Sequence, residues 1–170
     1  LPPASAPDQI PKLEQFVGTL WDIGLEVGHS VRTIDECVAL AAQDITVQTS
    51  LLEARLLTGD RKLYRHFEKE FTRGLDPQQF CKAKQLEQEQ RHERYRDTNL
   101  EPNIKETAGG LRDLHNILWI SKAAGIGDAW SDLVQREIIT RREATQLRQH
   151  ESFLQNLRIR LHYLARRREE

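Results

Sequence analysis

The chain has 170 residues, of which 38% are hydrophobic and 30% are charged, and its net charge is −1. This length allows one domain with a real core or two small ones, and the few glycines and prolines, 9 and 6, argue against a sandwich of many short strands. A balanced charge lacks the basic excess on which general binding to nucleic acids or membrane surfaces depends, so we expect neither kind of partner.

Cysteine spacing and hydropathy favour a cytoplasmic protein. Cys37 and Cys81 show no spacing typical of a metal or redox site, which indicates small core residues in a reducing compartment. No run approaches the roughly 18 apolar residues of a membrane-spanning helix, and the first residues lack a signal-peptide pattern. The chain has no methionine and its helical pattern continues to Glu170, so we expect a piece of a longer protein.

The first part of the chain predicts one helix and one strand. Residues 1–9 are rich in Pro, Ala and Ser and are expected to form an extended lead-in, and a short helix follows over residues 10–17, up to a glycine. Residues 19–31 alternate between apolar and polar side chains, which predicts a strand. Asp22 and Glu26 would share one face of this strand.

The middle of the chain carries four signals for helix starts, at Thr33, Asp44, Asp60 and Asp76. The first opens a capping box, in which a Thr and a Glu side chain satisfy free backbone N–H groups. The last is followed by a proline at the first helical position, where proline is tolerated well. At Asp44 a second strand is the alternative, and we favour a helix that ends at Gly59.

The helix expected after Asp76 carries few apolar residues but has an ordered polar face. Its members recur at helical spacing: Lys84, Gln88, Arg91, His92 and Tyr95. A solvated face with ion pairs along the helix is the simpler interpretation, and the charge pattern alone favours it. The alternative is a helix that lines a polyanion site, because these side chains suit a triphosphate.

The stretch 101–115, EPNIKETAGGLRDLH, predicts a sharp turn into an amphipathic helix. Gly109 and Gly110 stand at the helix start, where two glycines cost stability unless the backbone turns sharply or lets something approach closely. Free N–H groups at a helix start bind anions, and Lys105 and Arg112 lie where such a site would recruit cations. The alternative is a helix start whose glycines pack against a neighbour, and the pattern alone favours it.

The last part of the chain predicts two further helices. Asp128 is expected to cap a short one, and a capping box that begins at Thr140 opens a long one. The long helix has leucines at the spacing of a bundle seam: Leu147, Leu154, Leu157, Leu161 and Leu164.

The chain alone shows no complete catalytic constellation. It contains no P-loop, no GxGxxG, GxSxG or HExxH motif and no adjacent His-Asp dyad. It also lacks the paired Asp-x-Asp that two-metal nucleotidyl transfer needs.

Five stretches in a fixed order resemble one protein family. They are LWDIGLEVGHSVRTIDEC, TSLLEARLLTGD, KQLEQEQRHERY, LEPNIKETAGGLRDLHNILWI and LRIRLHYL. From about residue 12 onward the chain resembles the bacterial bifunctional uridylyltransferase/uridylyl-removing enzymes that modify the PII nitrogen-signalling protein. A more distant resemblance is to glutamine synthetase adenylyltransferase.

The resemblance implies a mainly α chain within an α+β protein. A late strand of a DNA polymerase beta-like nucleotidyltransferase sheet, placed at residues 19–31, would be followed by a helical bundle. The implied domains are the distal part of the nucleotidyltransferase over residues 10–60 and a helical bundle over residues 61–170, truncated at its C-terminal end.

The resemblance also implies a reaction and its participants. UTP would donate UMP to a tyrosine of the PII protein, pyrophosphate would leave, and the reaction would depend on Mg²⁺. The Asp-x-Asp strand that holds the metals in this family is expected upstream of Leu1, and the hydrolase and ligand-sensing domains downstream of Glu170. We therefore expect this chain to be inactive alone and to hold no complete metal site.

Site residues follow from the same resemblance. A third carboxylate that completes the metal site would be Glu26 or Asp22, with Glu53 as a weaker candidate, and each could equally be an exposed or intrahelical residue. The residues expected on the triphosphate and base side of the cleft are Lys84, Arg91, His92, Lys105, Gly109, Gly110, Arg112, Asp113 and His115. This assignment requires Lys84 and Arg91 to lie on the same side of the molecule as Lys105 and Arg112.

Two alternatives remain open at this point. The chain could be a helical interaction module without a nucleotide role, which would dock a partner protein through its leucine seam, Leu147–Leu164, or through the face Arg91–Arg96. It could also belong to an adenylyl-transferring relative, which nucleotide preference would separate from a uridylyltransferase.

Overall fold

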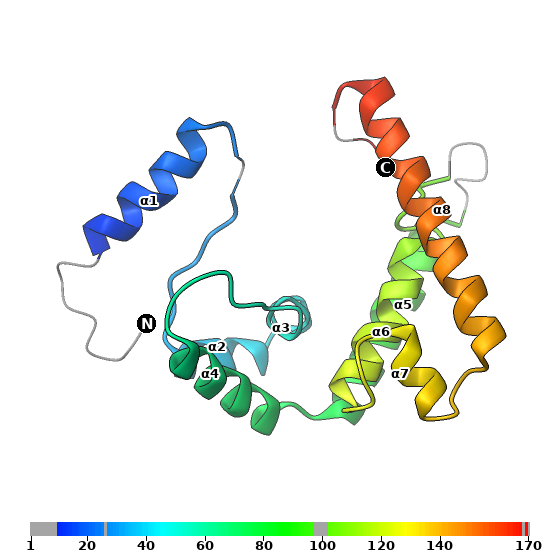
Figure 1. Ribbon diagram of the computed structural model, residues 1–170, viewed down its shortest axis with the longest axis horizontal. Coiled ribbons are helices and arrows are strands. Elements are labelled where there is room, and N and C mark those ends of the chain that lie inside the picture. Colours follow the sequence, from blue (N-terminus) through cyan, green and yellow to red (C-terminus); the bar gives the residue numbers. More distant parts are fainter. Residues whose placement is uncertain (1–9, 26, 97–101, 168, 170) are drawn as a thin grey trace. The chain divides into compact units, whose positions relative to one another are not determined.

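The computed structural model describes residues 10–25, 27–96, 102–167 and 169, and the regular structure in these residues is helical, without a strand (Figure 1). The helices are α1 (Ile10–Asp22), α2 (Ile34–Ala41), α3 (Ile45–Leu52), α4 (Arg61–Gly74), α5 (Pro77–Arg94), α6 (Leu111–Ala123), α7 (Trp130–Gln135) and α8 (Arg141–Ala165). The expectation of a mainly α chain with a helical bundle is thus confirmed in its helical part. None of the described helices combines the length and the apolar character that crossing a lipid bilayer requires.

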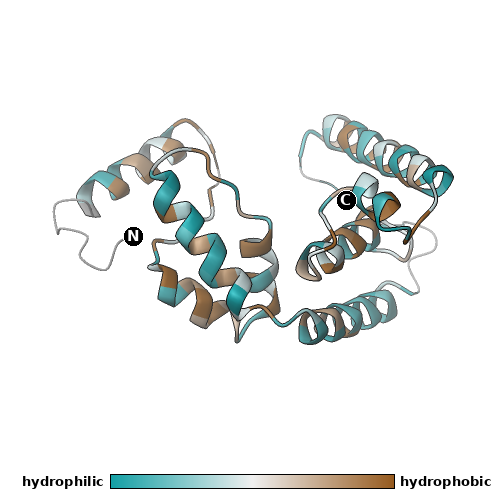
Figure 2. Ribbon diagram, turned by 60° about the horizontal axis from the view of Figure 1, so that its bottom comes forward, coloured by the Kyte–Doolittle hydropathy of each residue, from teal (hydrophilic) through white to brown (hydrophobic). Residues whose placement is uncertain are grey.

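The contacts divide the chain into two compact units, one that ends at Gly74 and one that begins at Leu75. By its contacts α4 belongs to the first unit, and the family domains given above as residues 10–60 and 61–170 stay a prediction. Apolar and polar residues are interspersed along most helices, as expected of helices that bury one face (Figure 2).

In the first unit, α2 packs against both α3 and α4 and buries Ala41, Leu52 and Phe71. The capping box predicted at the start of α2 is present. The Thr33 N–H donates to the Glu36 carboxylate at 2.7 Å, and the Glu36 N–H donates to the Thr33 hydroxyl at 3.3 Å. Together these bonds satisfy backbone N–H groups that have no partner within the helix.

The helix predicted from Asp44 forms, but it ends earlier than expected. The Asp44 carboxylate accepts the N–H groups of Thr46 and Val47, so the helix rather than the alternative strand is confirmed. It ends at Leu52 instead of Gly59, and just beyond its end the Ala54 carbonyl accepts the Tyr64 hydroxyl of α4 at 2.7 Å.

The strand predicted over residues 19–31 is wrong, as is the helix stop at Gly18. Helix α1 runs through Gly18 to Asp22, and the turn that ends it forms at Gly24, whose φ is +84°. The apolar residues that alternate over two positions also extend a helical stripe that starts earlier, at Leu13, Phe16 and Val17. A strand needs a neighbour for its backbone hydrogen bonds, and no described residue offers one, so the helical period prevails.

In the second unit, α5 packs on α6, and α8 packs on both α6 and α7. Trp130, Leu133 and Ala144 form a buried cluster, and Leu147 is among the apolar side chains packed against it. The caps predicted at Asp76 and Thr140 are both confirmed. For α7 the carboxylate that caps the helix is Asp132 rather than Asp128; it accepts the N–H groups of Asp128 and Ala129.

The leucine seam of α8 is packed only over part of its length among the described contacts. Leu147 contacts the core cluster, and Leu154 and Leu161 are half-buried. Leu157 is 38% exposed, and Leu164 is 82% exposed. A leucine spacing identifies the face of a helix but not the length of the surface that covers it.

Candidate functional site

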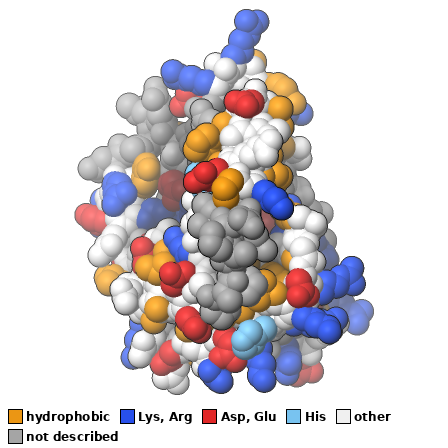
Figure 3. All heavy atoms as spheres, turned by 90° about the vertical axis from the view of Figure 1, so that its left-hand side faces the viewer, with side chains coloured by type: hydrophobic (Ala, Val, Ile, Leu, Met, Phe, Trp, Pro, Cys, Tyr) orange, Lys and Arg blue, Asp and Glu red, His pale blue; other side chains and the backbone are white. Residues whose placement is uncertain are grey.

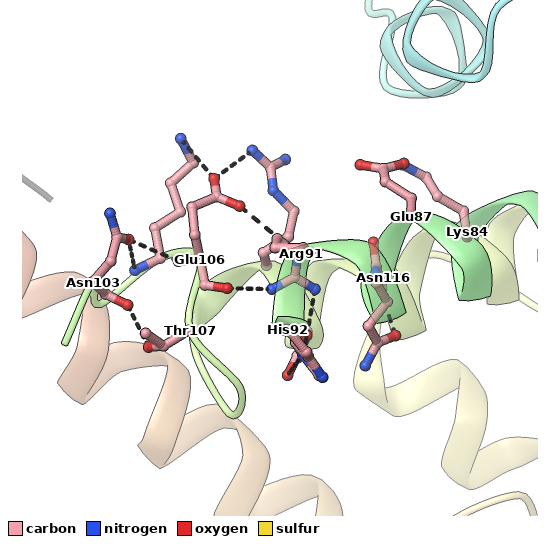
Figure 4. A network of polar contacts seen from close by, with 12 residues as sticks. Lys84, Glu87, Arg91, His92, Asn103, Glu106, Thr107 and Asn116 are labelled. Carbon is pink, nitrogen blue, oxygen red and sulfur yellow. Dashed lines mark hydrogen bonds and ion pairs between the residues drawn. The ribbon is translucent and has the colours of Figure 1, made fainter. Parts of the chain in front are cut away.

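The segment before α6 is a compact turn organised by Asn103. Its side-chain oxygen accepts the N–H groups of Lys105 at 3.0 Å and Glu106 at 2.8 Å, and its backbone oxygen accepts the Thr107 hydroxyl. Figure 4 shows this turn beside α5. Asparagine commonly forms such local bonds, which hold a backbone turn without help from a sheet or helix.

Gly110 is required where the turn meets α6. A Cβ atom at this position would lie 2.7 Å from the carbonyl oxygen of Ile104 and 2.9 Å from those of Lys105 and Thr107. Gly109 has a φ of +78°, which side-chain-bearing residues rarely adopt. Gly109 therefore permits the sharp turn and Gly110 permits the close backbone approach. These are the two circumstances in which paired glycines are expected at a helix start.

The backbone N–H groups at the start of α6 already have partners. The Leu111 N–H donates to the Ile104 carbonyl at 3.1 Å, and the Arg112 N–H donates to the Lys105 carbonyl at 2.9 Å. These groups are the ones that an anion at a helix start would use. In this structure, anion binding at the segment would have to rely on side chains rather than on these two N–H groups.

The polar face of α5 packs against α6 instead of facing solvent. Lys84 and Arg91 are buried, and the Asn116 amide donates to the Gln88 side chain at 3.4 Å. The interpretation of this stripe as a solvated face is therefore wrong. The face is a polar seam between two helices, and Figure 4 shows one of its members, Arg91, reaching the turn at Glu106. Such a seam is stable only where its groups are paired.

Asp113 is the central acceptor of this seam. Its carboxylate accepts hydrogen bonds from the Arg91 guanidinium and the Gly109 N–H, the latter at 2.7 Å, and lies 3.0 Å from His92 Nε2. Burial opposes ionisation of this carboxyl, but the bonds from Arg91, Gly109 and His92 and the charge of Arg91 outweigh it, so the pKa of Asp113 is lowered.

Glu106 is a second acceptor, and three cations surround it. Its Oε1 atom lies 3.1 Å from an Arg112 nitrogen and 3.3 Å from Lys105 Nζ, and Oε2 lies 3.8 Å from Arg91 Nε. Its backbone carbonyl accepts a further bond from Arg91 at 2.7 Å. Burial opposes ionisation here too, but Arg112 and Lys105 prevail and lower the pKa of the Glu106 carboxyl.

The Trp119 ring contacts three of the predicted site residues, Lys84, Arg112 and His115. Lys84 Nζ lies 4.5 Å from its ring centroid, and the Arg112 guanidinium carbon lies 5.3 Å from it. The His115 ring is also in contact, with centroids 5.7 Å apart. The Lys84 ammonium, 2% exposed, is paired with Glu87 at 2.8 Å. Cations at these distances from an indole face are attracted to it.

The structure thus brings the predicted triphosphate-side residues together in one unit. Arg91 and Arg112 share Glu106, and Lys84 and Arg112 share Trp119, so the arrangement that would have excluded a common site is not found. Asn103, Glu106 and Trp119 were missed as site residues. Their signal was weak, because a carboxylate between cations and an asparagine after a proline occur on many surfaces.

A cavity of about 630 Å³ opens beside the Glu106 cluster. Side chains from the end of α5 and from the turn line it, including Arg91, Arg94, Tyr95, Asn103, Lys105 and Glu106. On the face of the molecule drawn in Figure 3, acidic and basic side chains are interspersed, and no broad field of one sign covers it.

No group of possible metal ligands among the described residues supports the prediction of a third carboxylate that completes a metal site. Asp22 is the last residue of α1 and Glu53 follows α3 as its C-cap, and both are exposed; Glu26 lies outside the described residues. Among the residues the structure describes, no group of three or more His, Cys, Asp or Glu side chains could hold a metal ion. Asp113 and Glu106 are engaged with cations, so the residues described do not fit a Mg²⁺ site.

Comparison with known proteins assigns the chain to a family. The family model described as GlnD PII-uridylyltransferase matches residues 79–170, which include every member of the cluster above. The bifunctional uridylyltransferase/uridylyl-removing enzyme of Nitrosospira multiformis is 58% identical over 94% of this chain. Those of Cupriavidus pinatubonensis and Burkholderia thailandensis are 53% and 51% identical over 96% and 100% of it.

The chain covers only a small part of these relatives. It spans 18%, 19% and 20% of their respective lengths, about a fifth in each case. No solved structure matches it. Because the family match covers more than half of the chain and the similar relatives carry the same name, the chain belongs to the GlnD PII-uridylyltransferase family.

Proposed function

We propose that this chain supplies the nucleotide-facing helical wall of a cytoplasmic nucleotidyltransferase that transfers UMP from UTP to a tyrosine of the PII signalling protein in nitrogen regulation. Membership of the family and the names of the relatives support the reaction. On this proposal the chain is inactive alone and acts as part of a larger bifunctional enzyme, as its relatives are named.

One observation carries the proposal for the site. Arg91, Lys105 and Arg112 gather around a single acidic side chain at the edge of a cavity, within the part of the chain that matches the family. Guanidinium groups bind phosphate oxygens in a fixed geometry, and positive groups that neutralise charge on a departing pyrophosphate accelerate phosphoryl and nucleotidyl transfer. The chain's own residues would bind and orient the triphosphate.

Other predicted residues would act behind this surface. Asp113 holds Arg91 and His92 in place, and the two glycines shape the turn that presents Lys105. Mg²⁺ would supply charge neutralisation in the complete enzyme, but the residues described here do not fit a site for it. We therefore assign the metal to no residue of this chain.

The experiment uses a version of the chain extended upstream through the remainder of the transferase region. Titration with Mg-UTP, together with the rate of PII modification, compares the extended protein with its Arg112→Ala and Arg136→Ala variants. Arg136 is an exposed arginine at the end of α7 and serves as the matched control. Loss of a charge-assisted contact at Arg112 should weaken UTP binding by about tenfold or more.

The two arginine variants decide the assignment. Circular dichroism first establishes that both are folded. If the extended enzyme is active and Arg112→Ala leaves both UTP affinity and rate unchanged, the triphosphate assignment is wrong. Preference for ATP over UTP in the same assay would instead identify an adenylyl-transferring protein.

A separate observation favours the alternative function, a helical module that binds a partner protein. Tyr163 and Leu164 near the end of α8 are 81% and 82% exposed, which is unusual for large apolar side chains at neighbouring positions. Dimerisation in sedimentation experiments that Leu164→Asp abolishes, combined with no response of the polar seam to Mg-UTP, would favour this function over the transferase wall.

A further inference from the structure

The Glu106 carboxylate occupies the space between the cations that a phosphate group would have to contact. We infer that Glu106 is an internal competitor at this site, and that a chain of two or more phosphate groups binds by displacing this one side chain. The inference rests on the proposed function, because it concerns the same cations, and it adds a mechanism that regulates access to them.

The contacts of Glu106 make it easier to displace than its neighbour. Its carboxylate oxygens lie 3.1, 3.3 and 3.8 Å from the three cations, and the side chain is 19% exposed. Asp113, by contrast, receives shorter bonds from Arg91 and from the Gly109 N–H, and sits in the first turn of α6. A rotation of the Glu106 side chain breaks one hydrogen bond, from Arg112, and two longer ion contacts, whereas movement of Asp113 would disrupt the helix start.

The turn keeps its shape without the Glu106 carboxylate. Its backbone is held by the Asn103 side chain, by the Thr107 hydroxyl and by the bond from Arg91 to the Glu106 carbonyl oxygen. None of these bonds uses the carboxylate oxygens. Displacement is therefore a side-chain rotation and does not require the segment to unfold.

The two arginines also keep contacts of their own when the carboxylate leaves. Arg91 remains bonded to Asp113 and to a backbone carbonyl, and Arg112 remains over the face of Trp119 at 5.3 Å. A site whose groups are fixed in advance loses little conformational entropy on binding. The two arginines are thus preorganised for whichever anion replaces Glu106.

The number of negative charges on the ligand determines which class of anion can displace Glu106. A single phosphate would replace one carboxylate with little gain, whereas a polyphosphate brings several charges to Arg91, Lys105 and Arg112. The adjoining cavity of about 630 Å³ has Arg94 on its wall, together with Glu87 and Glu169, and it provides space for the rest of such a chain. The ligand class is therefore a polyphosphate, of which a nucleoside triphosphate is one member.

The test measures binding of inorganic tripolyphosphate to the 170-residue chain by isothermal titration calorimetry at constant ionic strength. The unmodified chain is compared with Glu106→Gln, which keeps the shape of the side chain and removes the competing charge. Glu87→Gln is the matched control, because Glu87 lines the same cavity but pairs with Lys84. We expect Glu106→Gln to bind about tenfold more tightly than the unmodified chain and Glu87→Gln less than about threefold more tightly.

A second measurement applies to the unmodified chain and does not depend on how the variant folds. The pKa of the Glu106 carboxyl, lowered by Arg112 and Lys105 against the effect of burial, can be followed by carbon-13 NMR. Saturating tripolyphosphate should raise this pKa, because the displaced carboxylate loses its cations. A Glu106 pKa that stays low in the presence of tripolyphosphate overturns the inference. An equal gain in tripolyphosphate affinity in Glu106→Gln and Glu87→Gln also overturns it, as does the absence of tripolyphosphate binding by Glu106→Gln.

Failure of this inference is distinct from failure of the proposed function. Glu106→Gln could show no gain in affinity for tripolyphosphate while Arg112→Ala still weakens UTP binding in the extended enzyme. In that case the nucleotide binds beside Glu106 without displacing it. If Glu106→Gln gains affinity for tripolyphosphate but Arg112→Ala leaves UTP binding unchanged, the polyphosphate site exists but is not the UTP site.

Discussion

Arg91 of α5 donates a hydrogen bond to Asp113 of α6, and this pair is the main electrostatic link between the two helices. The two side chains are 8% and 16% exposed, and the same guanidinium reaches the backbone carbonyl of Glu106 in the turn. One arginine thereby joins α5 to both the turn and the start of α6, at positions that lie 15 and 22 residues further along the chain. Its Nε atom has no hydrogen-bond partner, and the nearest carboxylate oxygen, from Glu106, is 3.8 Å away.

The first prediction concerns this pair. Asp113→Asn keeps the shape of the side chain but leaves the buried Arg91 without its closest counter-charge. An uncompensated buried charge is costly, so we expect the free energy of unfolding to fall by about 3 kcal/mol. Urea denaturation, followed by tryptophan fluorescence in a Trp21→Phe background, reports on the second unit through Trp119 and Trp130.

Glu93→Gln is the control for that prediction. Glu93 of α5 pairs with Arg96 just beyond the end of this helix, but both side chains are about two-thirds exposed, at 66% and 70%. Exposed pairs contribute little, so this variant should change stability by less than about 0.5 kcal/mol. Equal effects of the two substitutions would show that burial of the Arg91–Asp113 pair does not matter energetically.

The sequence predicted the helical spacing of the α5 polar stripe but not what covers it. Period 3.6 placed Lys84, Arg91 and His92 on one face, and they do share one. Whether that face meets water or another helix depends on tertiary contacts, and a polar seam between helices has the same pattern as a solvated surface. The partner, Asp113, lies 22 residues beyond Arg91, a distance at which local periodicity carries no information.

Capping residues predicted the helix starts correctly, whereas the period-2 pattern predicted a strand that is not found in the described residues. The caps at Thr33 and Asp76 could be inferred because each depends on contacts within a few residues. Residues 19–31 satisfied a period-2 pattern, but strand formation depends on a neighbouring strand that the sequence of this segment does not encode. The C-terminal αL glycine of α1 was Gly24 rather than Gly18, two positions that a local pattern does not distinguish.

The second prediction is a loss of stability in acid. Asp113 and Glu106 both have pKa values lowered below their ordinary values of 3.8 and 4.5. A carboxyl with a lower pKa in the folded than in the unfolded state contributes stability above its unfolded pKa, and this contribution is lost as the pH falls through the folded pKa. Stability of the second unit should therefore be level above about pH 5 and decline below about pH 4.

Urea denaturation at a series of pH values tests this dependence. The Asp113→Asn variant, which cannot titrate at that position, should show a shallower decline than the unmodified chain. The slope should not vanish, because Glu106 and the capping carboxylate Glu143 also have lowered pKa values. Identical slopes for the two proteins would mean that Asp113 contributes nothing to the acid sensitivity.

The third prediction separates the roles of the two adjacent glycines. Gly110→Ala places a Cβ atom 2.7 Å from the Ile104 carbonyl oxygen and 2.9 Å from two more backbone oxygens, so the turn must shift. Gly109→Ala meets open space, and its cost is the left-handed φ of +78° alone. We expect losses of about 3 kcal/mol for Gly110→Ala and about 1 kcal/mol for Gly109→Ala. A larger cost at Gly109 than at Gly110 in urea denaturation would contradict the close-approach interpretation.

The fourth prediction asks whether Lys84 stabilises the fold through its charge or through its buried stem. Its ammonium lies over Trp119 and pairs with Glu87, whose side chain is 40% exposed and can be hydrated when the lysine charge is removed. Lys84→Met preserves the length of the stem and should change stability by less than about 1.5 kcal/mol, whereas Lys84→Ala leaves a cavity and should cost about 3 kcal/mol. In the extended transferase, Lys84→Met should also retain UTP affinity, because a side chain that is 2% exposed supports the site from behind. A loss of UTP affinity by Lys84→Met at unchanged stability would instead place the ammonium in direct contact with the nucleotide.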